Sequence, residues 1–310
     1  MNIEKQILAT LAYFNLFDYP LTQQEIVRFL NCKPEVREFE EGLERLVNHC
    51  FVCKIGSYYS LVNDRSLMER RAMGNERAAK MMRSAQRSAS LISCFPFVKA
   101  VAISGSLSKN FADEWADVDF FIITSRQRLW TCRTLLHLFK KLTFLATRQH
   151  LFCMNYFIDE SHPVILEKNI YTATEVLTII PARGSFTEFF AANNWAKAFL
   201  PNVLAGTAPT KKNIRTWART IVEFALHNTI GDTLDNFLMN ATAKRWTAKT
   251  LNNKRNSKGN ILAMHAGKHF SKPSPENFQR HLLRRYEKSI NELFNRYDAA
   301  TTTRRKQAVP

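Results

Sequence analysis

The feature that most constrains this 310-residue chain is a tight turn between two apolar runs, at residues 98–124. Residues 98–104 (VKAVAIS) read as a short buried strand, and Gly105-Ser106 follows it directly. Ten residues later, Asp117-Val118-Asp119 opens a second apolar run. Side chains alternate between the faces of a strand, so both aspartates project to one side, about 6 to 7 Å apart. Two carboxylates on one face repel each other unless something positive lies between them.

The natural occupant of such a carboxylate pair is a hard divalent cation, Mg²⁺ or Mn²⁺, which also binds substrate phosphates. Phosphoryl and nucleotidyl transfer need such an ion at the reacting phosphate. Gly105 allows a phosphate to approach the backbone closely, and the Ser106 hydroxyl can donate to it. Lys109 is a further candidate contact to phosphate. The residues therefore indicate a site for a nucleoside triphosphate, with Asp117 and Asp119 as its metal ligands.

The segment SGSLSKNFADEWADVDFF (residues 104–121) resembles the signature of the DNA polymerase beta type nucleotidyltransferase superfamily. The matching residues are Gly105, Ser106, Asp117 and Asp119, whereas Ser104 stands where the signature has a hydrophobic residue. The resemblance implies a mixed sheet with helices over about residues 94–160. It also implies an activity: Mg²⁺-dependent transfer of a nucleoside monophosphate from a nucleoside triphosphate to a hydroxyl acceptor, which the sequence does not identify.

Members of this superfamily usually carry a third acidic residue on a following strand. Here the next strand is expected at residues 151–158 (LFCMNYFI), where alternation places Cys153, Asn155 and Phe157 on one face. The first acidic residue that this alternation places on the same face is Asp159, which we expect to be the third catalytic carboxylate. Two alternatives remain open: Glu160 or Glu167 takes the role, or transfer is slow or absent.

Residues 1–64 predict an N-terminal winged helix-turn-helix. Apolar spacing indicates a helix over 3–17, Thr22 with Glu25 forms a capping-box pattern before a second helix, and Pro34 opens a third. Two short strands joined around Gly56-Ser57 complete the pattern. The third helix is rich in glutamate, and DNA phosphates need positive charge on the docking face. Contact with another protein, or a lid-like scaffold, is therefore favoured over DNA readout.

The remaining chain divides by charge. We expect a basic linker helix at 65–93, the nucleotidyltransferase domain at 94–204 and a helical basic region at 205–310. Residues 241–310 carry 16 basic and 4 acidic side chains, which suits RNA or another acidic partner or, as a simpler explanation, a solvated tail. Aromatic residues around Phe186–Trp195 are expected in the core rather than in a base-stacking platform.

The expected class is therefore α+β, with a winged helix-turn-helix, a mixed sheet with helices and a C-terminal helical region. The start of the chain lacks the pattern of a signal peptide, no apolar stretch is long enough to span a bilayer, and the six scattered cysteines suit a reducing compartment. We expect a cytoplasmic protein without a membrane partner. The alternative function is a catalytically degenerate nucleotidyltransferase fold that acts as a nucleic-acid-binding or protein-binding regulator.

Overall fold

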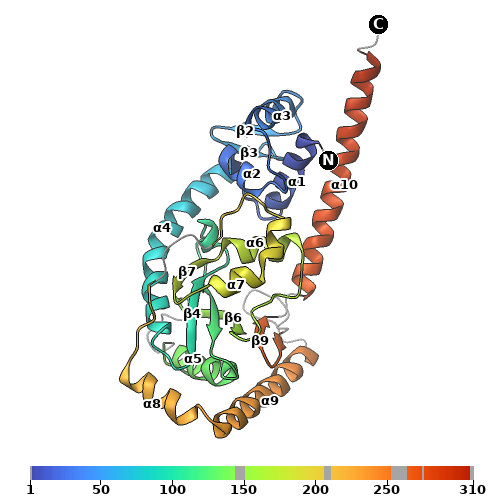
Figure 1. The fold of residues 1–310 in the computed structure, drawn as a ribbon. Helices are drawn as coiled ribbons and strands as arrows, with labels where there is room; N and C mark the ends of the chain where they lie inside the picture. Colours follow the sequence, from blue (N-terminus) through green and yellow to red (C-terminus); the bar gives the residue numbers. More distant parts are fainter. Residues whose placement is uncertain (1, 144–150, 206–210, 253–263, 274–275, 308–310) are drawn as a thin grey trace.

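The computed structural model belongs to the α+β class and contains a mixed sheet (Figure 1). It describes all residues except 1, 144–150, 206–210, 253–263, 274–275 and 308–310. Two sheets are present in the described part of the chain, one small and N-terminal, the other large and central. Among the described helices, none combines the length and the apolar character that crossing a membrane requires.

The N-terminal unit contains three helices and a small antiparallel sheet. Its elements are α1 (Ile3–Asn15), β1 (Leu21–Thr22), α2 (Gln23–Phe29), α3 (Val36–Asn48), β2 (Cys53–Ile55) and β3 (Tyr58–Ser60). The strand order is β1-β3-β2. The predicted capping box is present: the Thr22 hydroxyl accepts from the Glu25 backbone N–H at 3.2 Å, and the Glu25 carboxylate accepts from the Thr22 N–H at 3.0 Å.

Helix α3 buries one apolar edge and exposes an acidic one. Phe39, Leu43 and Leu46 are buried in the N-terminal core. The solvent side carries a set of exposed glutamates, namely Glu35, Glu38, Glu40, Glu41 and Glu44. The two arginines of this helix are engaged with acids, Arg37 with Glu41 at 2.8 Å and Arg45 with Glu4 at 2.6 Å. The exposed face therefore offers little unpaired positive charge to a phosphate backbone.

Helix α4 (Ser66–Ile92) occupies the region where the sequence predicts a basic linker helix. It packs directly on the central sheet, because Ala85, Ala89 and Ile92 are buried against Val98 and Val101 of β4 (Val98–Ile103). Its small residues allow this close approach, while Arg83 and Arg87 face solvent and Arg71 is buried in an ion pair with Glu25 at 2.6 Å. The helix is thus an integral layer of the central unit rather than a free connection.

The central sheet is assembled from distant parts of the chain. Within the described residues it has six strands, in the order β7-β4-β5-β6-β9-β8. Strands β4 and β5 (Asp119–Thr124) are antiparallel, and β5 runs parallel to β6 (Cys153–Asp159). The edges are formed by β7 (Ile180–Arg183) on one side and by β9 (Phe270–Pro273) and β8 (Met264–Ala266) on the other.

Helices cover both faces of this sheet, which explains why β4 and β5 are apolar nearly throughout. One face packs against α6 (Ile170–Thr178), α7 (Thr187–Ala192) and a 3-10 helix (Asn194–Ala198), through Phe121, Phe186 and Phe189. The other face packs against α4, α5 (Leu129–Thr143) and α9 (Thr229–Leu251). The aromatic run after residue 185 therefore contributes to the core, as predicted.

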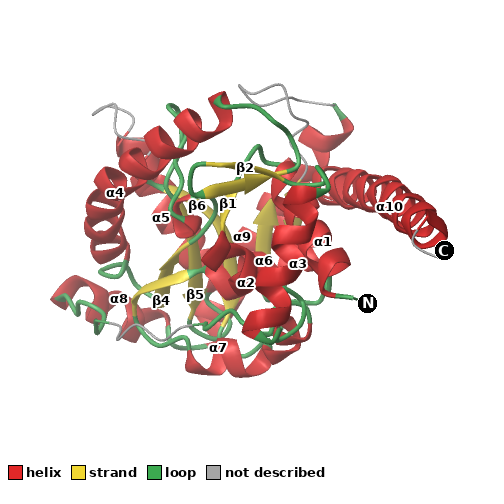
Figure 2. Cartoon of the chain, turned by 90° about the horizontal axis from the view of Figure 1, so that it is seen from above, coloured by secondary structure: helices red, strands yellow, loops and turns green. Residues whose placement is uncertain are grey.

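The last helix, α10 (Glu276–Gln307), runs beside α1 and extends past the N-terminal unit (Figure 1). The two helices are joined by a hydrogen bond from Asn2 to the Tyr297 hydroxyl at 3.2 Å and by an ion pair between Lys5 and Asp298 at 2.7 Å. Seen from above, α4 and α10 lie on opposite sides of the molecule (Figure 2). The contacts of Asn2 and Lys5 with α10 therefore hold the C-terminal helix against the N-terminal unit.

Pro181 lies in β7, an edge strand, where a missing N–H is tolerated. Helices α8 (Trp217–Leu226) and α9 pack on the face of the sheet opposite to α6 and α7. Of the basic C-terminal stretch 241–310, residues 253–263, 274–275 and 308–310 fall outside the described residues.

Gly74 on α4 is a helical glycine whose replacement by alanine is expected to lower the free energy of unfolding. Replacing a helical glycine with alanine ordinarily stabilises a helix by about 1 kcal/mol. Here the new Cβ would overlap the ring of Phe111, which is itself held between Tyr19 and Arg70. We expect Gly74→Ala to lower the free energy of unfolding by roughly 1 to 3 kcal/mol, measured by urea denaturation. Gln86→Ala, at an exposed position of the same helix, should change it by less than about 0.5 kcal/mol; equal values would contradict this packing.

Candidate functional site

The turn after β4 and the start of β5 face each other closely. Antiparallel pairing of Ile103 with Phe120 brings Gly105 beside Asp119, and the Ser104 N–H donates to the Asp119 carbonyl at 2.9 Å. Gly105 has φ +68°, and a Cβ built on it would lie 2.5 Å from Asp119 Oδ2. Glycine is therefore required at position 105 for two reasons: the backbone has a positive φ, and the Asp119 carboxylate occupies the space that a Cβ would need.

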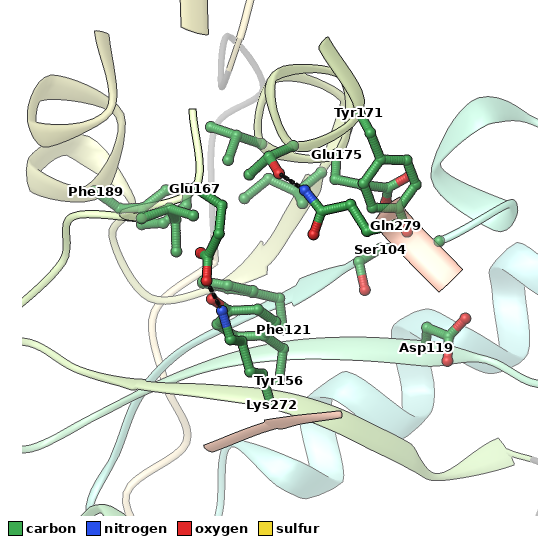
Figure 3. A pocket seen from close by; sticks show the side chains of 15 residues that line it. Ser104, Asp119, Phe121, Tyr156, Glu167, Tyr171, Glu175, Phe189, Lys272 and Gln279 are labelled. Carbon is green, nitrogen blue, oxygen red and sulfur yellow. Dashed lines mark hydrogen bonds and ion pairs between the residues drawn. The ribbon is translucent and has the colours of Figure 1, made fainter. Parts of the chain in front are cut away.

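Asp119 lines a cavity of about 220 Å³ on the face of the sheet covered by α6 (Figure 3). Aromatic rings form much of its wall, including Phe121, Tyr156 and Phe189. Glu167 and Lys272 pair with each other across the cavity, and the Gln279 side chain donates to the Thr172 hydroxyl at 3.1 Å. The cavity thus has largely apolar walls, with three carboxylates, those of Asp119, Glu167 and Glu175, and the Lys272 ammonium group at its border.

A second cavity, of about 410 Å³, lies between the N-terminal unit and the turn. Its walls include Ser106, Lys109 and Arg70, together with aromatic residues of α1 and the loop after it. The two cavities share three lining residues, Gly105, Tyr171 and Glu175. The turn at Gly105 therefore borders two chambers, one lined by both basic and acidic side chains and one largely apolar.

Burial raises the pKa of the Asp119 carboxyl to about 6. A hydrogen bond with the Cys153 side chain opposes this shift, the negative charges of Glu175 and Asp117 add to it, and Lys109 lowers it. Asp117, half-buried just before β5, lines neither cavity. Asp119, Asp117 and Glu175 therefore lie close enough to influence one another, and the positive charge of Lys109 offsets only part of their negative charge.

Glu175 is a residue that the sequence analysis did not single out. It projects from α6 and lies 2.8 Å from the Lys109 ammonium group, which also donates to the Gly105 carbonyl at 3.0 Å. Lys109 therefore holds an acid near the turn rather than pointing freely into the second cavity. The signal was available, because Glu175 is the one charged residue between positions 170 and 182.

The structure does not bring Asp159 to this site. Strands β5 and β6 are parallel and pair Asp119 with Cys153, so Asp159 lies six residues further on, at the opposite end of the strands. At about 3.3 Å per residue, this is roughly 20 Å away. The strand position beside Asp119 holds a thiol, and burial raises the pKa of Cys153 to about 12. Of the other two acids considered, Glu167 lines the apolar cavity, and Glu160 pairs with Lys99 at 3.4 Å.

The expected alternation along β6 is also interrupted. The register against β5 shifts between Phe120 and Phe121, so that Phe121 pairs with Tyr156 and the backbone of Asn155 is the extra residue of a bulge. Phe157 consequently packs on the face opposite to the candidate site, with Met154. The prediction that Cys153 and Phe157 share a face was wrong for this reason.

Asp159 instead belongs to a compact polar cluster with His162 and His269, whose ligand atoms lie within 4.8 Å of one another. This set could in principle hold a metal ion. However, the two imidazoles are stacked with centroids 3.5 Å apart and planes 18° apart, and a metal must lie in the plane of each ring that ligates it. The rings would have to separate to share an ion, and the Asp159 carboxylate already accepts several hydrogen bonds.

The chain matches no protein-family model, no curated protein and no solved structure.

Proposed function

We propose that this chain is a nucleotidyltransferase that moves a nucleoside monophosphate from a nucleoside triphosphate to a hydroxyl acceptor and uses Mg²⁺. The observation that carries the proposal is the close approach of Gly105 to Asp119 where the two cavities meet. A strand, a Gly-Ser turn and a second strand that begins with an aspartate are the parts that the sequence motif calls for. The order β4-β5-β6, antiparallel and then parallel, is consistent with a nucleotidyltransferase-type sheet.

The chemistry of the donor groups fits a hard divalent cation. Asp117, Asp119 and Glu175 offer carboxylate oxygens, and the Cys153 thiol stays protonated because its pKa is raised. Burial raises the pKa of Asp119, the neighbouring acids Glu175 and Asp117 add to the shift, and a bound cation would stabilise the charged carboxylate against both effects. When bound, Mg²⁺ supplies charge neutralisation at the phosphate oxygens and orients the displacement. Asp117 and Asp119 are the residues that would hold it.

The protein groups around the turn have complementary roles in this proposal. Ser106 and the backbone at Gly105 face the larger cavity, where they can bind the phosphates together with Arg70. Glu175 is the nearest acid to take the place of the third carboxylate, and its oxygen would accept the proton of the attacking hydroxyl. Lys109 is a positioning residue, since its ion pair fixes Glu175 beside the turn.

Calorimetric titration tests this function. Each of the four ribonucleoside triphosphates would be titrated into the protein with Mg²⁺ and, separately, with a chelator. We expect at least one triphosphate to bind in the presence of Mg²⁺, and binding to be lost in the chelator. A folded protein that binds none of the four would contradict the proposal and favour the regulator hypothesis, in which the fold is a scaffold.

A further inference from the structure

Helix α8 turns two charged residues toward the body, where Val222 and Leu226 also pack against the core, and exposes a second set of apolar residues to solvent. Arg219 is buried and donates to the carbonyls of Ser93 and Val98, both at 2.8 Å. Glu223 also faces the body, where it accepts from Arg219 and from the Phe97 N–H at 2.8 Å. The opposite side of the helix presents three large apolar residues to solvent, Trp217 (79% exposed), Ile221 (58%) and Phe224 (86%).

Helix α9 also turns acidic residues toward the body and exposes large apolar ones, although Leu238, Met239 and Trp246 pack against the core. Asp232 pairs with Arg128 at 2.5 Å, and Asp235 accepts from the backbone and the hydroxyl of Thr131. Ile230 and Phe237, two turns apart, are 70% and 66% exposed. Helices α8 and α9 lie together at the end of the molecule farthest from the N-terminal unit (Figure 1). We call the five side chains Trp217, Ile221, Phe224, Ile230 and Phe237 the apolar face.

Basic residues directly precede the apolar face in the sequence. Lys211, Lys212 and Arg215 are exposed immediately before α8, and Ile214 between them is also exposed. The acids of the two helices are Glu223, Asp232 and Asp235, and each is engaged with an arginine or a threonine of the described chain. The surface is therefore apolar and positive, with its acidic groups turned inward.

The shape and charge of this surface indicate what covers it. Side chains that are about four-fifths exposed stand on a convex surface, because the walls of a groove would cover them. A convex face of tryptophan, phenylalanine and isoleucine next to lysine and arginine is typical of protein segments that lie in the interface of an anionic membrane. A second copy of the chain would bring the same positive charges together.

We propose that the apolar face docks on the surface of an anionic phospholipid bilayer. The apolar side chains enter the headgroup region, and Lys211, Lys212 and Arg215 contact the lipid phosphates. This is a peripheral contact of two helices, and it departs from the sequence-based expectation of no membrane partner. It is independent of the proposed transferase activity, since the apolar face and the candidate site lie on opposite faces of the sheet.

Co-sedimentation of the full chain with vesicles tests the proposal. Vesicles of equal parts phosphatidylglycerol and phosphatidylcholine should bind the protein, and pure phosphatidylcholine should bind it far less. The double variant Trp217→Ser/Phe224→Ser should weaken binding about tenfold or more, and Lys211→Ser/Lys212→Ser/Arg215→Ser about a hundredfold at low salt. The matched controls are Trp115→Ser, at an 82% exposed tryptophan elsewhere, and Lys168→Ser/Lys197→Ser/Arg296→Ser.

Tryptophan emission gives a second readout, because insertion of Trp217 should shift the spectrum to the blue and Trp217→Phe should remove the shift. Three results would overturn the proposal: no binding to the anionic vesicles, binding that both the Trp217→Ser/Phe224→Ser and the Lys211→Ser/Lys212→Ser/Arg215→Ser variants retain, or binding that the control variants lose equally. Light scattering tests the other possible occupant of the apolar face, a second copy of the chain. A dimer that Trp217→Ser/Phe224→Ser converts to a monomer would assign the face to a second copy of the chain.

Discussion

Asp119→Asn is expected to abolish Mg²⁺-dependent triphosphate binding while raising the free energy of unfolding at pH 7. The carboxylate that faces Gly105 is the group best placed to ligate the ion, and an amide is a poor ligand without a negative charge. The same substitution removes a charge that is disfavoured by burial and by the neighbouring acids Glu175 and Asp117. Function and stability should therefore change in opposite directions, which is typical of a site residue.

The stability change should depend on pH. Because the pKa of Asp119 in the folded chain is raised from 3.8 to about 6, the folded state binds the proton more tightly than the unfolded state does. Its contribution to stability is complete below about pH 4 and is lost as the pH rises through 6. Asp119→Asn should therefore match the wild type near pH 4 and exceed it by roughly 2 kcal/mol above pH 7, in urea denaturation without metal.

Glu188→Gln, at an exposed acid on α7, is the control and should change neither triphosphate binding nor the pH profile. Addition of Mg²⁺ should raise the melting temperature of the wild type and leave that of Asp119→Asn unchanged. If Asp119→Asn bound Mg²⁺ and triphosphate normally, the turn at Gly105 would be structural and the transferase proposal would fail. If it unfolded, the aspartate would be needed for folding, contrary to the burial penalty inferred here.

Local patterns in the sequence predicted those parts of the fold that local chemistry determines. The Thr22 capping box, helix α4 and the turn between β4 and β5 each depend on a few consecutive residues. The approach of Gly105 to Asp119 follows from the same principle, since two strands joined by a short excursion pair with each other. The core of the candidate site was therefore accessible from the sequence.

Positions that depend on register or on distant segments were not accessible. Asp159 was assigned by parity along one strand, but the parallel pairing of β5 with β6 decides which end of the strand meets Asp119. The bulge at Asn155 adds one residue and changes the face of all that follows. Glu175 and Lys272 reach the cavity from α6 and β9, and no local pattern states that these elements lie beside the turn.

The periodicity of apolar residues also does not determine which side of a helix faces the body of the protein. The spacing of Trp217, Ile221 and Phe224 is that of an apolar stripe on a helix, and all three lie on α8. It did not indicate that Arg219 and Glu223 would anchor the helix by hydrogen bonds to the body and turn that stripe outward. The energetic reason is that buried carbonyls of Ser93 and Val98 need donors, which a buried arginine supplies.

Asp159→Ala is expected to lower the free energy of unfolding by about 3 to 5 kcal/mol and to leave Mg²⁺-dependent triphosphate binding intact. The Asp159 side chain is fully buried and accepts from the Gln127 N–H at 2.9 Å and from the Ser161 N–H and hydroxyl at 2.8 and 2.7 Å. It also pairs with His269 at 3.2 Å. Alanine would remove the buried acceptor that these partly buried donors share, in the loops that join β5 to α5 and β6 to α6.

Asp159→Asn separates the two roles that have been considered for this residue. Asparagine fills the same space and keeps one acceptor oxygen, so it should recover part of the stability that alanine loses, as urea denaturation would report. A third catalytic carboxylate would behave otherwise, because Asp159→Asn would then be folded and unable to transfer. Glu175→Gln is the matched variant, since it removes an acid at the turn itself. We expect Glu175→Gln to impair transfer and Asp159→Asn to spare it; the reverse result would restore Asp159 as the third acid and show that the pairing of β5 with β6 has been misassigned.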